Sequence, residues 1–121
     1  MKKDNIVVEK TYAFAIRIVK CYKYLTTEQK EFVLSKQMLR SGTSIGANVE
    51  EAVGGQSEKD FYSKLNISYK EARETHYWLR LLRDTEFLDK KISESLLTDN
   101  EEILKLIGSI IKTMKSKIPN S

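Results

Sequence analysis

Cysteine, proline and histidine are almost absent: the 121 residues include one of each. Cys21 has no second thiol with which to form an intramolecular disulfide, and we expect no metal site and no cofactor. The first ten residues contain only a short apolar run before charge resumes, so we expect neither a signal peptide nor a membrane anchor, and a cytoplasmic protein. A hydrophobic core alone must therefore stabilise the fold.

The sequence also lacks the apolar/polar alternation of a half-buried strand. Apolar residues recur instead at spacings of three and four over residues 5–24, 27–53 and 58–85, and from residue 93 onward. Short connections between long helices favour antiparallel neighbours. We therefore predict an all-α fold, an antiparallel up-down-up-down four-helix bundle, with residues 1–121 as one domain.

Local signals mark the ends of the second and third segments. Thr26 and Gln29 form a T-x-x-Q pattern, which predicts a capping box at the start of the second helix. Gly54 and Gly55 are expected to end it, because glycine adopts the left-handed conformation without steric cost. Ser57 is expected to cap the third helix.

The first segment carries two neighbouring apolar stripes, which together are wider than one contact inside a bundle requires. We assign the first stripe to the core: Val8, Tyr12, Ala15, Val19 and Tyr22. The second stripe contains Phe14 and Ile18, and on the third segment Ile67 and Trp78 add further apolar surface away from the core face. These four residues are the predicted interface of a homo-oligomer.

Residues 40–52, RSGTSIGANVEEA, place two glycines inside a helical pattern. Each glycine costs roughly 0.5–1 kcal/mol relative to alanine, so Gly42 and Gly46 predict a close approach of another backbone. Beside them lies a polar stripe of four residues: Arg40, Ser44, Asn48 and Glu51. We favour a structural role, with Ser44 and Asn48 bonded to a neighbouring helix or loop, over the alternative of a ligand or nucleic-acid surface.

Together with residues 57–82, SEKDFYSKLNISYKEARETHYWLRLL, this segment resembles the proteins encoded in intervening sequences of 23S ribosomal RNA genes. It is also similar to the accessory proteins of diversity-generating retroelements. The resemblance implies a four-helix bundle that assembles as a ring, a pentamer, with basic surfaces that contact nucleic acid. It does not imply a particular biochemical activity, because the family has no settled one.

The formal net charge of +4 is unevenly distributed. Basic residues form a row opposite the core of the third segment and another row on the first segment, as contact with a phosphate backbone requires. A solvated surface is the alternative interpretation. The predicted RNA or DNA contacts are Lys10, Arg17, Lys20, Lys59, Lys70, Arg73 and Arg80.

Catalysis is not expected. A di-iron bundle needs Glu-x-x-His on two helices, whereas His76 follows Glu74 by two positions and the pair Glu71 and Glu74 lies off the apolar face. No phosphate-binding glycine loop or nucleophile arrangement is present. The favoured function is a non-enzymatic oligomer that contacts nucleic acid. The alternatives are a protein-protein adaptor that binds another chain through its Trp78 and Phe14 surfaces, and a bundle that binds a small molecule or a metal.

Overall fold

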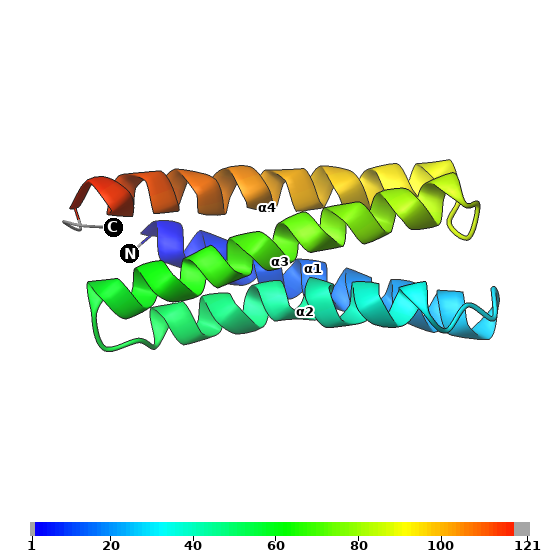
Figure 1. Ribbon diagram of the computed structural model, residues 1–121, viewed down its shortest axis with the longest axis horizontal. Helices are drawn as coiled ribbons and strands as arrows, with labels where there is room; N and C mark the ends of the chain where they lie inside the picture. The colour runs from blue at the N-terminus through cyan, green and yellow to red at the C-terminus, as the bar shows by residue number, and fades with distance from the viewer. Residues whose placement is uncertain (1, 118–121) are drawn as a thin grey trace.

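The computed structural model describes residues 2–117, with side chains from residue 5 onward. This part of the chain forms four helices and no strand, packed as an all-α bundle (Figure 1). The helices are α1 (Lys2–Thr27), α2 (Leu34–Val53), α3 (Glu58–Asp84) and α4 (Lys90–Lys117).

Each helix packs against two others. α2 contacts α1 and α3, and α4 contacts α3 and, less extensively, α1, whereas α1 and α3 share no close backbone contact within the described residues. α1 and α3 therefore lie diagonally across the bundle. Between α2 and α3 the Ser68 hydroxyl donates to the carbonyl of Ile45 (2.8 Å), and the Thr75 and Ser41 hydroxyls lie 2.8 Å apart. Residue numbers thus rise along α3 as they fall along α2.

The core faces of α2, α3 and α4 are largely those that the spacing predicts. The buried residues from these faces are Met38, Ile45, Val49, Ala52, Leu65, Ala72, Leu79, Leu82, Leu96, Ile103, Ile107 and Ile110. Ile92 lies four residues before Leu96, a spacing that would place it on the same face, but it is exposed. It lies in the first turn of α4, which begins at Lys90 rather than at residue 93.

The two apolar stripes of α1 are assigned to the wrong sides in the sequence-based prediction. Phe14 and Ile18, predicted at an oligomer interface, are 1% and 0% exposed within the chain's own core. Tyr12 and Val19, predicted in the core, are exposed. The physical reason is that both stripes are apolar, and Ile18 packs directly over the missing side chain of Gly42. Phe14 and Ile18 therefore cannot form the interface.

The predicted capping box at Thr26 is also wrong. Thr26 lies in the last turn of α1, where its hydroxyl donates to a carbonyl one turn earlier, and α2 begins only at Leu34. The nearly buried carboxylate of Glu31 caps α2 by accepting the backbone N–H groups of Val33, Leu34 and Ser35 at 3.1, 2.9 and 2.6 Å. A charged oxygen at this end also complements the helix dipole.

The predicted end of α2 and the predicted start of α3 are at the expected residues. α2 ends at Val53, but Gly54 has a φ of −82°, so the left-handed conformation is not what ends it. The Ser57 hydroxyl accepts the N–H of Asp60 at 3.0 Å and caps α3 as expected.

Candidate nucleic-acid interface

The outer face of α3 carries four exposed cations and one exposed aromatic ring. Their positions fall on the side opposite the buried face of α3, at spacings of three, four and eleven residues. We call this surface the α3 ridge: Lys59, Lys70, Arg73, Tyr77 and Arg80. None of the four cations pairs with a carboxylate of residues 5–117. The ridge is therefore a cationic strip along most of the length of α3.

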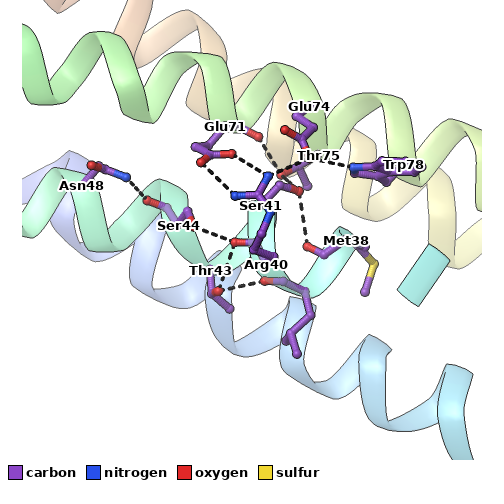
Figure 2. Close-up of polar contacts among 11 residues, drawn as sticks. Met38, Arg40, Ser41, Thr43, Ser44, Asn48, Glu71, Glu74, Thr75 and Trp78 are labelled. Atoms are coloured by element: carbon purple, nitrogen blue, oxygen red, sulfur yellow. Dashed lines mark hydrogen bonds and ion pairs between the residues drawn. The ribbon is translucent and has the colours of Figure 1, made fainter. Parts of the chain in front are cut away.

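The two acids in the middle of α3 are held away from this ridge. Between Asp60 and Asp84 the only acids of the helix are Glu71 and Glu74, and both pair with Arg40 of α2 (Figure 2). The Arg40 guanidinium donates to the two oxygens of Glu71 at 3.1 and 3.2 Å and to Glu74 at 2.7 Å. These hydrogen bonds, first with Glu71 and then with Glu74, raise the pKa of Arg40. Arg40 thus keeps both carboxylates on the α2 side of α3.

Trp78 belongs to the same network. Its indole N–H donates to the Glu74 oxygen that Arg40 also contacts, at 3.0 Å (Figure 2). The hydrogen bond from Trp78, followed by the one from Arg40, lowers the pKa of Glu74. Trp78 is partly buried against the core, whereas Ile67, the other interface residue predicted on this helix, is 41% exposed. Trp78 therefore offers less exposed surface to a partner chain than the prediction assumed.

The polar stripe of α2 makes internal hydrogen bonds, but not the ones expected. The Ser44 hydroxyl donates to the carbonyl of Arg40 (2.6 Å), and the Asn48 amide donates to the carbonyl of Ser44 (2.9 Å). Both bonds stay within α2, and among the described side chains Ser44 and Asn48 make none of the expected bonds to a neighbouring element. The ends of the stripe reach α3 instead, through Arg40 and through the ion pair between Glu51 and Lys64 (2.9 Å).

The predicted close approach of another backbone is confirmed at Gly46, whereas Gly42 meets a side chain. A Cβ at Gly46 would lie 3.3 Å from the carbonyl oxygen of Thr11, a backbone atom of α1. Gly42 lies against Ile18 of the same helix. The two glycines therefore set how closely α1 and α2 pack.

The basic row of α1 is largely engaged inside the chain. Lys10 pairs with Glu102 of α4, and Arg17 pairs with Asp99 of α4 at 2.6 Å. Lys20 is exposed and has no ion pair among the described side chains. Since two of these three cations already have carboxylate partners, this row offers less unpaired charge than the α3 ridge.

An exposed apolar patch lies on α1 where it meets α2. Tyr12, Ile16 and Val19 are 64%, 42% and 36% exposed. Beside Tyr12, the small residues Gly46 and Ala47 of α2 leave a hollow of about 310 Å³ that contains one charged side chain, Glu50. Apolar spacing alone did not predict this patch, because it placed Tyr12 and Val19 in the core. The sequence did indicate excess apolar surface here, because the two apolar stripes of α1 are together wider than one contact inside a bundle requires.

The remaining candidate groups form no recognisable catalytic arrangement in residues 5–117. His76 Nε2 lies 2.9 Å from Glu101 of α4, and among the described side chains no group of three or more His, Cys, Asp or Glu is placed to hold a metal ion. Cys21 is buried, which raises the pKa of its thiol to about 11. None of the helices described here is both long and apolar enough to cross a membrane.

Residues 3–109 match the family model described as 23S rRNA-intervening sequence protein. The chain belongs to this family. A similar solved structure is that of a protein of unknown function from the S23 ribosomal protein family of Bacteroides thetaiotaomicron, 59% identical, with a TM-score of 0.89. The alignment covers 91% of this chain and 98% of that one. The comparison with curated proteins finds no match.

Proposed function

We propose that this protein is a non-enzymatic homo-oligomer whose antiparallel four-helix bundles contact the phosphate backbone of RNA or DNA through the α3 ridge. The observation that carries the proposal is the separation of charge on α3. Its four ridge cations have no carboxylate partner among the described residues, while Arg40 holds Glu71 and Glu74 on the α2 side of the helix. Unpaired cations in a row suit a phosphate backbone, because such contacts need charge density rather than base-edge geometry.

Several further observations support this function. The family is named for intervening sequences of 23S rRNA, which associates its members with ribosomal RNA genes. Opposite residue-number order along α2 and α3 supports the antiparallel topology. Lys10, Arg17 and Lys20 of α1 are secondary contacts in this proposal, since Lys10 and Arg17 would have to exchange a carboxylate of α4 for a phosphate.

Self-association is the second part of the proposal. The bundle exposes two different apolar patches on its diagonally placed helices: Tyr12, Ile16 and Val19 on α1, and Ile67 beside the partly buried Trp78 on α3. Contacts between two unlike patches are heterologous, and heterologous contacts close into a ring when the rotation allows it. A pentameric ring, which the family resemblance implies, would present five copies of the α3 ridge and add avidity.

The salt dependence of binding tests the nucleic-acid contact. We expect log affinity for labelled RNA and DNA oligonucleotides to fall linearly with log salt concentration. Removing two phosphate contacts with Arg73→Gln/Arg80→Gln should flatten that slope by about 1.4–1.8 for each subunit engaged, at about 0.7–0.9 per contact. The matched control is Lys23→Gln/Lys36→Gln, which removes the same charge from exposed positions on α1 and α2. No binding at low salt, or equal slopes for both double variants, would contradict the proposal and favour the protein-protein adaptor.

A further inference from the structure

Tyr77 is the one aromatic residue of the α3 ridge, and it lies between cations. It is 49% exposed, one turn after Arg73 and one turn before Arg80. The guanidinium carbon of Arg80 lies 5.9 Å from the centre of its ring. The ring of Trp78 lies 5.0 Å away at 74°, an edge-to-face arrangement. Two neighbours therefore hold a ring that is still half open to solvent.

Trp78 is in turn fixed by its hydrogen bond to Glu74, which Arg40 also contacts. Tyr77 is thus supported by a network that reaches α2. Such support lowers the conformational entropy that an exposed aromatic side chain loses when it binds.

An aromatic ring set among cations is the combination by which proteins bind single-stranded nucleic acid. The cations contact phosphates, and the ring stacks on an unpaired base. A duplex offers phosphates to the same cations but keeps its bases stacked on one another. Arg73 and Arg80 are seven residues apart, about 10 Å along the helix, with Tyr77 between them. The ridge can therefore hold a strand by its phosphates while one base reaches the ring.

We infer that Tyr77 stacks on an unpaired base and makes the α3 ridge selective for single-stranded RNA or DNA over duplex. This inference rests on the proposed function and adds the form of nucleic acid that the ridge prefers. It needs no base-specific hydrogen bond, so the strand's sequence has little effect on affinity.

The test compares single-stranded and duplex oligonucleotides of equal length with the full chain. We expect Tyr77→Leu to weaken single-strand binding by at least about fivefold, the lower end of the loss per stacked base, and to leave duplex binding unchanged. Tyr77→Phe keeps the ring and should retain the wild-type affinity. Tyr24→Leu is the matched control, because Tyr24 is also exposed but lies on α1 away from the ridge. Light scattering checks that the oligomer mass is the same for every variant.

The fluorescence of Trp78, the only tryptophan, provides a second readout next to the ring. We expect single strands to change its emission in the wild type and in Tyr77→Phe, but not in Tyr77→Leu. Binding of neither nucleic acid would overturn the proposed function and the inference together. Single-strand binding that Tyr77→Leu does not weaken, or equal losses for single strands and duplex, would overturn the inference alone. A lower oligomer mass in Tyr77→Leu would also overturn it and place Tyr77 at a subunit contact.

Discussion

Gly42 of α2 lies so close to Ile18 of α1 that a Cβ at position 42 would be 2.8 Å from both Cγ atoms of the isoleucine. Ile18 is fully buried and β-branched, so it has little freedom to move aside. Contact between the two helices thus depends on the absence of a side chain at position 42. This contact also helps to direct the Phe14 and Ile18 side of α1 toward the core.

Gly42→Ala should therefore destabilise the protein. We expect overpacking to cost about 1–3 kcal/mol, more than offsetting the gain of up to about 1 kcal/mol in helix propensity. Urea denaturation measures the difference. Gly108→Ala is the control, because its new Cβ would meet only the edge of the Tyr69 ring at 3.3 Å, and it should be neutral or stabilising. Equal effects of the two substitutions would contradict this account.

Gly46 provides a graded test of the same interface. Its new Cβ would lie 3.3 Å from a backbone oxygen of Thr11, so packing and propensity nearly cancel in Gly46→Ala. Gly46→Leu should destabilise by about 1–3 kcal/mol, because a larger side chain forces α1 away. If Gly46→Ala raises the melting temperature as much as Gly108→Ala does, close packing does not explain this glycine.

Glu31→Gln should show how much the carboxylate cap of α2 contributes. Burial works to raise the pKa of Glu31, but the hydrogen bonds from the backbone of Leu34, Ser35 and Val33 outweigh it and the pKa is lowered. A lowered pKa stabilises the fold above the ordinary carboxyl pKa of 4.5, and this contribution is lost as pH falls through the folded-state value.

We expect Glu31→Gln to reduce the unfolding free energy by about 0.5–2 kcal/mol at neutral pH. The difference from the wild type should shrink below the ordinary carboxyl range, as measured by denaturation at several pH values. Glu28→Gln changes an exposed acid near the end of α1 and should have little effect. A Glu31→Gln deficit that stays constant with pH would rule out the ionised cap as its source.

Arg40→Gln should weaken nucleic-acid binding although Arg40 is not part of the α3 ridge. The substitution leaves Glu71 and Glu74 without their cation, and two unpaired carboxylates near the ridge repel phosphates at low salt. We expect an affinity loss of a few fold and a small stability change, since Arg40 is half exposed. Oligonucleotide titration at low salt provides the measurement.

Removal of the two acids distinguishes the cause. The triple variant Arg40→Gln/Glu71→Gln/Glu74→Gln should recover the wild-type affinity if Arg40 acts by neutralising them. An affinity as low as that of Arg40→Gln alone would mean that Arg40 itself contacts the nucleic acid.

Apolar spacing was enough to predict four helices and most of the core of α2, α3 and α4, because each of those helices has one dominant apolar face. It could not orient α1, where both stripes are apolar and the choice depends on what α2 presents at Gly42. The start of α2 was missed because its cap is a glutamate that follows Lys30, a non-glycine residue with φ of 54°. That geometry matches no common capping pattern.

The candidate site was predictable in outline only. Spacing placed the cations of α3 on one face, since every third or fourth residue of a helix shares a side. Their partners depend on the packing of other helices. The sequence does not show that Arg40 pairs with an acid of α3. Nor does it show that Lys10 pairs with Glu102 and Arg17 with Asp99.

Substitutions on the two sides of α1 should have opposite consequences and so test self-association. Ile16→Glu places a charge in the exposed patch, and we expect a smaller mass by sedimentation with unchanged helical circular dichroism. Phe14→Glu would bury a carboxylate in the core, because Phe14 is almost completely enclosed. It should cost about 4 kcal/mol or more and unfold much of the population. A wild-type monomer at tens of micromolar would contradict self-association. An Ile16→Glu oligomer of unchanged mass would place the contact elsewhere on the bundle.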